Sequence, residues 1–180
     1  AAGRKAITEG LALDAGNVET DDQGIRVGDN LRSVSNKRVW ALGDVAGKGQ
    51  FTHLAGWHGS VFVRRALFKQ SSTSSSLPLP AVTYTVPEVA QVGLTEDEAR
   101  KAHGDKIEVS RFAFEENDRA IAEGKTTGEC KLVLKKGKLV GASIVGEGAG
   151  DIIQLVGYAL SNKMKLTSLT NFISPYPTRT

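Results

Sequence analysis

The chain has 180 residues, a hydrophobic fraction of 40% and a formal net charge of +3, enough apolar material for one domain or for one domain and part of another. Its basic residues form no stripe and no apolar run approaches the roughly 20 residues that cross a bilayer, so neither nucleic acid nor a membrane is an expected partner. The single cysteine, Cys130, excludes an internal disulfide and favours a reducing, cytoplasmic compartment.

The N-terminal stretch is rich in small residues, with Ala1-Ala2-Gly3-Arg4 followed by Gly10-Leu11-Ala12-Leu13. Small residues suit a backbone that approaches another group closely, and a turn ending a strand is the plain alternative. Apolar and polar residues then alternate between turn formers in residues 21–30, which predicts a short hairpin strand.

The central stretch of the first half runs from Val39 to Ala46. Its β-branched and apolar residues lead into Gly43-Asp44, which predicts a buried strand that delivers one carboxylate at its C-terminal end. A Gly-rich turn over 47–50 follows, and an apolar helix is predicted from Phe51 to about Leu67. The helical stripe expected in the core comprises Trp57, Val61, Phe62, Ala66 and Leu67.

An Asp, a glycine turn and an exposed helix start together predict a site for a ligand with hydroxyls and an electron-rich group. Asp44 can accept hydrogen bonds from ribose-type or ribityl hydroxyls, and the first helical N–H groups can face a polarised carbonyl. The alternative is that Asp44 only caps the helix, which leaves the Gly-rich turn unexplained. His53 and His58 are expected on different helix faces, and no His/Cys metal site is predicted.

The polar run Gln70–Ser76 and the following Leu77-Pro78-Leu79-Pro80 indicate a domain boundary. We therefore predict a first segment over 1–70, a linker over 71–80 and a compact α+β unit over 81–180.

In the second unit, Thr95 and Glu98 are spaced as a capping box at the start of a helix. Cys130 is expected to pack as an inert residue, because no second cysteine exists to form a redox pair. A tight turn at Lys136-Gly137 is predicted to join the last two strands. The predicted strands are 81–85, 106–114, 129–135 and 138–145.

Two further stretches suggest sites that we do not favour. The charged connection 115–120 is interpreted as a solvated loop rather than a substrate contact. In Gly146–Asp151, the third glycine of a Gly-x-Gly-x-x-Gly motif falls on Asp151, and two carboxylates would oppose a pyrophosphate. We predict a turn there, followed by an amphipathic helix whose wide apolar face suits core and subunit contacts.

Several stretches together resemble the flavoprotein pyridine nucleotide-disulfide oxidoreductases, the family of dihydrolipoamide dehydrogenase, glutathione reductase and mercuric reductase. These stretches are Ala1–Arg4, Ala41–Ala46 with Phe51–Ala55, Pro87–Glu96 and Pro175–Thr178. The resemblance covers the whole chain and places it as the C-terminal part of a longer enzyme, in keeping with a start at Ala1 without Met.

The resemblance implies an FAD site and a route for electrons. Gly3, Gly43 and Phe51 would belong to this site, Asp44 would hold the ribityl or adjacent phosphate region, and Thr52 and His53 would lie against the isoalloxazine ring. NAD(P)H would deliver hydride to FAD, and electrons would pass on to a cysteine pair.

Tyr176 stands where the family has a catalytic His, and the family Glu would follow Thr180. A phenol with a pKa of about 10 is a poor base at neutral pH, whereas an imidazole exchanges protons readily. Two interpretations stay open for Tyr176. Its hydroxyl could approach a thiolate-bound metal ion, as in mercuric reductase and its relatives, or it could be a packing residue in an enzyme with a changed substrate.

We therefore expect an α+β chain: an antiparallel sheet with flanking helices, forming a reductase dimerisation domain, preceded by a remnant of an α/β FAD-binding domain. The expected function is part of a homodimeric NAD(P)H:disulfide or mercuric-ion oxidoreductase, paired through 81–180, with a small-molecule or metal-ion substrate. Alone the fragment is expected to be inactive, because it lacks the first flavin motif, the cysteine pair and the nicotinamide domain. The alternative is a non-catalytic dimerisation module.

Overall fold

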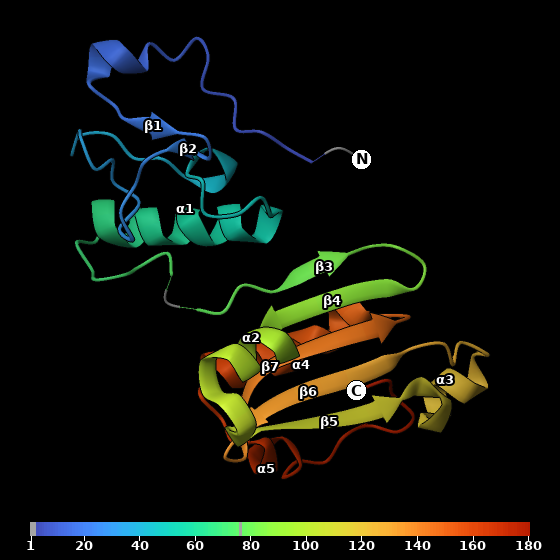
Figure 1. Cartoon of the computed structure of the whole chain (residues 1–180). Helices are drawn as coiled ribbons and strands as arrows, with labels where there is room; N and C mark the ends of the chain where they lie inside the picture. The colour runs from blue at the N-terminus through green and yellow to red at the C-terminus, as the bar shows by residue number, and fades with distance from the viewer. Residues whose placement is uncertain (1–2, 76) are drawn as a thin grey trace. The chain divides into compact units, whose positions relative to one another are not determined.

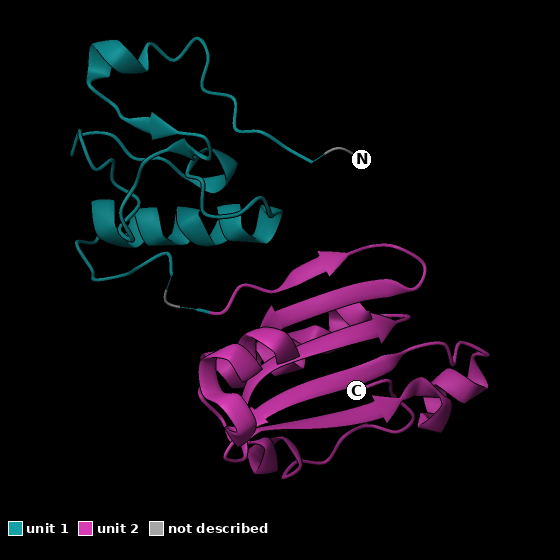
Figure 2. Cartoon of the chain, viewed as in Figure 1, with its two compact units in different colours: residues 1–77 teal, residues 78–180 magenta. Residues whose placement is uncertain are grey.

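The structure, a computed structural model, describes residues 3–75 and 77–180. The chain forms two compact units, residues 1–77 and 78–180 (Figure 2). The division falls within the predicted linker 71–80, whose first residues are bonded to the first unit. The Ser74 N–H donates to the Asp29 carbonyl at 2.8 Å, and the Trp57 indole N–H donates to the Ser74 carbonyl at 3.2 Å. The assignment of 1–70 to an FAD-binding domain stays a prediction.

The first unit has one long helix and a short hairpin (Figure 1). Strands β1 and β2 pair antiparallel, as predicted for this stretch. A small cluster of buried residues, Val18, Ile25, Ala41 and Ala46, joins the hairpin to the segment around η2. The elements are η1 (Leu13–Gly16), β1 (Thr20–Asp21), β2 (Gly24–Ile25), η2 (Gly43–Val45) and α1 (Thr52–Ala66).

The prediction of a buried strand that starts at Val39 and ends in Gly43-Asp44 is wrong. Within the described residues, this stretch makes two isolated antiparallel bridges, Arg32 with Trp40 and Gly24 with Ala46, and the Ala41 N–H donates to the Leu31 carbonyl at 3.1 Å. Gly43 then adopts a φ of +69°, in the left-handed region that glycine tolerates, and the chain turns into η2. A strand needs a continuous ladder of partners, and within the described residues this stretch has only isolated bridges, at Trp40 and at Ala46.

Helix α1 agrees with the predicted range to within one residue at each end. Its buried residues are Leu54, His58 and Val61, at the i, i+4 and i+7 spacing of one helix face. Leu67 is 69% exposed, so its place in the predicted core is wrong. It follows the last residue of α1, where the stripe of the helix no longer applies.

The second unit is a five-stranded antiparallel sheet in the order β3-β4-β7-β6-β5, with helices on both faces (Figure 1). The predicted strands and the tight turn at Lys136-Gly137 are confirmed, with small differences in bounds. The strands are β3 (Ala81–Thr83), β4 (Glu88–Gly93), β5 (Ile107–Ala113), β6 (Glu129–Lys135) and β7 (Lys138–Gly146). The helices are α2 (Glu96–His103), η3 (Gly104–Lys106), η4 (Phe114–Glu116), α3 (Asp118–Ala122), α4 (Ala149–Ser161) and α5 (Leu166–Leu169).

Side chains alternate along each strand and so fill two separate cores. On one face, Ala90, Val92 and Ile144 pack against Ile153 and Val156 of α4. On the other, Ile107 and Val133 pack against Ala99 of α2. Among the described residues, no helix combines the length and the apolar character needed to span a membrane.

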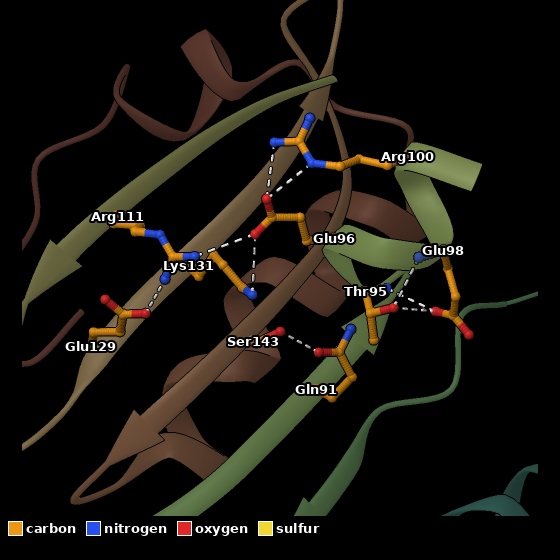
Figure 3. A network of polar contacts seen from close by, with 9 residues as sticks. All are labelled: Gln91, Thr95, Glu96, Glu98, Arg100, Arg111, Glu129, Lys131 and Ser143. Carbon is orange, nitrogen blue, oxygen red and sulfur yellow. Dashed lines mark hydrogen bonds and ion pairs between the residues drawn. The ribbon is translucent and has the colours of Figure 1, made fainter. Parts of the chain in front are cut away.

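Glu96, in the first turn of α2, ties that helix to the sheet (Figure 3). Its carboxylate accepts from Arg100 one turn along the helix at 2.9 Å, from Arg111 of β5 at 3.3 Å and from Lys131 of β6 at 3.5 Å. The hydrogen bond from Arg100, with the charges of Arg100 and Lys131, lowers the Glu96 pKa. The predicted capping box is also present, with Thr95 and Glu98 bonded to each other's backbone N–H groups.

The glycine turn before α4 holds a carboxylate from its own domain. Gly148 is the N-cap residue with a φ of +72°, and the Gly150 N–H donates to the Glu88 carboxylate at 2.9 Å. A Cβ on Gly146 would lie 2.2 Å from the Phe114 ring. Turn and helix are as predicted, and the start of the helix is occupied by Glu88.

The connection 115–120 is solvated, as predicted, because its charged residues are exposed, but it forms parts of two short helices rather than a loop. Phe114 opens η4 and is 3% exposed, and Ala120 within α3 is fully buried. Asn117 separates the two short helices and caps the second, because its side-chain oxygen accepts from the Ala120 N–H at 2.9 Å. Phe114, just before this connection, and Ala120, its last residue, pack into the core beneath α4.

Candidate functional site

The residues predicted for the site fall into two sets in different units. Gly3, Gly43, Asp44, Phe51, Thr52 and His53 belong to the first unit, and Tyr176 belongs to the second.

Within the first unit, the structure brings the N-terminal stretch to the Gly-rich turn before α1. A guanidinium nitrogen of Arg4 donates to the Gln50 carbonyl at 3.3 Å, and the Gln50 side-chain amide donates to the Arg4 carbonyl at 3.0 Å. These reciprocal bonds span 46 positions of the chain. Gly3, the neighbour of Arg4, therefore lies near Phe51, the neighbour of Gln50.

The Gly43-Asp44 turn packs on the first turns of α1. The Gly43 N–H donates to Nδ1 of His58 at 3.0 Å, and a Cβ on Gly43 would lie 3.2 Å from that of Ala55. The Asp44 carbonyl accepts from the Gly47 N–H at 3.1 Å. The half-buried Asp44 carboxylate itself makes no hydrogen bond or ion pair within the part of the chain that the structure describes.

His58 is a site residue that the sequence interpretation missed. Its side chain is fully buried, and burial, followed by the positive charge of Lys48, lowers its pKa. Because Nδ1 accepts the Gly43 N–H, the neutral ring carries its proton on Nε2. Nε2 is buried without a partner among residues 3–75 and 77–180. The spacing of His58 with Leu54 and Val61 was the signal that could have placed it in the core.

Phe51, Thr52 and His53 form the start of α1. Phe51 is the N-cap residue in extended conformation, and within the described residues no side chain caps this end. The Phe51 and His53 rings stack at 5.1 Å between centroids with an interplanar angle of 29°. The Thr52 and His53 side chains are exposed beside this uncapped helix start, where the helix dipole favours negative charge.

Tyr176 lies in the C-terminal segment and is 81% exposed. A hydrogen bond with Asp118, the first residue of α3, and the negative charge of that carboxylate raise the pKa of its phenol. At neutral pH the group is therefore a neutral phenol and not a phenolate.

Cys130 lies on β6, half-buried against the core beneath α4. Burial, with the nearby charge of Glu129, raises the pKa of its thiol. A protonated, half-buried thiol is a poor nucleophile, which agrees with a packing role.

The chain resembles known proteins along its whole length. The family model described as the pyridine nucleotide-disulphide oxidoreductase dimerisation domain matches residues 79–180. A mercuric reductase from Streptomyces lividans is 35% identical over 99% of this chain and 38% of its own length. A dihydrolipoyl dehydrogenase from Thermus scotoductus is 36% identical over 99% of this chain and 38% of its own length. The chain thus spans well under half of each relative.

Solved structures share the fold at lower identity. The HOCl-induced flavoprotein disulfide reductase RclA from Escherichia coli superposes with a TM-score of 0.91 at 22% identity, over 99% of this chain and 42% of RclA. LpdA from Mycobacterium tuberculosis gives a TM-score of 0.87 at 21% identity, over 97% of this chain and 38% of LpdA. The predicted family and fold class are confirmed. The chain belongs to the pyridine nucleotide-disulphide oxidoreductase family, and its residues 79–180 are that family's dimerisation domain.

Proposed function

We propose that this chain is the C-terminal part of a homodimeric, FAD-dependent NAD(P)H oxidoreductase that acts on a disulfide or on mercuric ion. In this proposal it supplies part of the FAD site and the dimer interface. The relatives named mercuric reductase and dihydrolipoyl dehydrogenase support an oxidoreductase. Their near-equal identities, 35% and 36%, do not distinguish the two substrates.

The FAD proposal is supported chiefly by Asp44. Its carboxylate makes no bond in the described part of the chain, and it sits on a turn packed against the start of α1. Carboxylate oxygens accept hydrogen bonds from sugar or ribityl hydroxyls, and a helix N-terminus attracts an electron-rich group. When bound, FAD supplies hydride acceptance and onward electron transfer. In this chain Asp44 would hold the hydroxyls, His58 would hold Gly43 and so fix the turn, and Gly3, Phe51, Thr52 and His53 would line the same site.

Tyr176 would face the substrate of the partner subunit. Its neutral phenol is unsuited to act as a general base, which disfavours the acid–base role of the family His. The same phenol can donate or accept a hydrogen bond near a substrate thiolate or a thiolate-bound metal ion. We therefore favour the mercuric reductase-like branch, with mercuric ion or another thiol-bound species as the substrate.

The alternative is a non-catalytic dimerisation module. It is supported by the family match, which covers the dimerisation domain over 79–180. A pure assembly module has no use for a carboxylate such as that of Asp44, which makes no bond among residues 3–75 and 77–180 and lies by the start of α1, so the first unit favours the oxidoreductase.

The experiment begins with the coding sequence on both sides of this chain. We expect two upstream Gly-x-Gly-x-x-Gly strands, a Cys-x-x-x-x-Cys pair and a Glu immediately after Thr180. The complete protein should then oxidise NADPH or NADH with mercuric ion or a disulfide as acceptor. A complete protein without the cysteine pair would exclude both reactions and leave the assembly module.

A further inference from the structure

The C-terminal segment 174–180 is fastened to α3 and the residues that follow it. The Asn117 side-chain amide donates to the Thr178 carbonyl at 3.1 Å, across 61 positions of the chain. Arg179 pairs with Glu123, 56 positions away, and a second guanidinium nitrogen donates to the Lys125 carbonyl at 3.5 Å. Three contacts over such separations cannot arise from local chain geometry, so this connection is a docking surface for the segment.

Asn117 uses both ends of its side-chain amide. Its oxygen caps α3 by accepting from the Ala120 N–H at 2.9 Å, and its nitrogen holds Thr178. One residue thus fixes both the start of α3 and the end of the chain. Any change in Asn117 that keeps the cap but removes the amide nitrogen separates these two roles.

Arg179 is bound more tightly than an ordinary surface arginine. Its side chain is 13% exposed, and a Cβ on Gly148, the N-cap of α4, would lie 3.8 Å from its Cδ. The Glu123 carboxylate accepts hydrogen bonds from Arg179 and from Arg119. Both bonds lower the pKa of Glu123, and the bond from Arg179 has the larger effect. Lys125 in turn pairs with Glu147 just before Gly148. The segment is therefore held between α3 and the start of α4.

The segment carries Tyr176, two residues before Thr178, so the Asn117–Thr178 bond brings Tyr176 to the start of α3, where Asp118 follows Asn117. Asp118 directly follows Asn117 and opens α3. Asp118 is the carboxylate that acts on the phenol. The other charged groups of this surface, Arg119, Glu123, Lys125, Glu147 and Arg179, are paired with one another.

We propose that α3 is the platform that positions Tyr176: Asn117 and Glu123 hold the segment through Thr178 and Arg179, and Asp118 accepts the phenolic hydrogen. The Tyr176 oxygen is then left with its lone pairs for a ligand. Asn117, Asp118 and Glu123 are positioning residues, and the value of positioning Tyr176 rests on the proposed function above.

The 180-residue chain itself provides the test, by phenolate absorbance during alkaline titration. The chain has three tyrosines, and subtraction of the Tyr176→Phe titration isolates Tyr176. In the wild type the Tyr176 midpoint should lie above the ordinary value of about 10, and Asp118→Asn should return it to about 10. Asn117→Ser, which keeps a capping oxygen but loses the amide nitrogen, should also lower the midpoint. Asp105→Asn, on η3, is the control and should leave it unchanged.

A second measurement follows the docking of the C-terminal segment directly, and so remains informative if a variant destabilises α3. In Asn117→Ser and Glu123→Gln, the backbone amides of Thr178 and Arg179 should gain mobility in nitrogen-15 relaxation, while circular dichroism of the sheet stays unchanged. An unshifted Tyr176 midpoint in Asp118→Asn, or rigid residues 178–179 in both docking variants, would overturn the proposal. Neither readout needs flavin or substrate, so a complete protein without FAD would defeat the proposed function and leave these results standing.

Discussion

Nδ1 of His58 accepts a hydrogen bond from the Gly43 N–H at 3.0 Å, and so joins the middle of α1 to the turn that carries Asp44. Both groups are buried, so neither can exchange its partner for water. Loss of this bond would leave the Gly43 donor unpaired and the Asp44 turn without its support from α1.

Replacement of His58 should therefore destabilise the first unit. We expect His58→Ala to lower its free energy of unfolding by about 2 kcal/mol or more, since an unpaired buried donor and a new cavity both contribute. Trp40 and Trp57, the two tryptophans of the chain, both lie in this unit, so urea unfolding followed by tryptophan fluorescence measures it selectively. A loss within 0.5 kcal/mol, about the effect of an ordinary surface substitution, would show that the bond is dispensable.

The same residue predicts a pH dependence. Burial holds the His58 pKa below the ordinary 6.5. Below pH 6.5, His58 is therefore protonated in the unfolded chain at pH values where it is still neutral in the folded chain. The stability from neutral His58 is complete above pH 6.5 and declines as the pH falls below it. His58→Gln should flatten this decline between about pH 7.5 and about pH 5.5, and His53→Gln on the same helix should retain it. If stability declines with falling pH equally steeply in both variants, His58 is not the cause of the decline.

The attachment of α2 to the sheet should depend on ionised Glu96. Its pKa is lowered, so its contribution is present above the unfolded value of 4.5 and is lost as the pH falls through the folded value. Glu96→Gln should speed hydrogen exchange in α2 at neutral pH and lessen the effect of added salt there. Glu108→Gln on β5, an exposed residue, should change neither. If hydrogen exchange in α2 is unaltered in Glu96→Gln, the apolar contacts of Ala99 are enough to hold α2 on the sheet.

Self-association should map to the second unit. We expect the chain to sediment as a dimer at high concentration. Tyr158 on α4 is 63% exposed, and we expect the partner chain to cover it. Tyr158→Glu should weaken the dimer, because the interface would then have to bury a charge. Lys138→Glu, at the exposed first residue of β7, is the control. Monomers alone at the highest attainable concentration would count against pairing through 81–180.

The isolated chain should bind FAD weakly or not at all, because the proposed function has residues outside this chain forming most of the FAD pocket. Gel filtration of the chain with added FAD, followed by absorbance near 450 nm, measures retention. Stoichiometric FAD in the protein peak would refute this expectation.

Local rules predicted most of the second unit because its sequence obeys them. Runs of strand-forming residues between turn residues predicted β5, β6 and β7, and the capping residues Thr95 and Glu98 predicted the start of α2. The errors arose where a side chain acts at long range. The strand over 39–46 depended on neighbours that the sequence does not display, and His58 and Asn117 have partners 15 and 61 positions away. Within the charged connection 115–120, the sequence analysis missed the buried Ala120, because four charged residues dominate the composition of that stretch.

The most direct test of the account is the flavin content of the complete protein that contains this chain. Wild-type protein should carry close to one FAD per chain. Asp44→Asn should weaken FAD binding about tenfold or more, since hydrogen bonds to a charged group contribute about 1.5–3 kcal/mol. Asp14→Asn, the same change in the first turn of η1, should bind FAD as the wild type does. Full FAD affinity in Asp44→Asn, or a complete wild-type protein without flavin, would contradict the account.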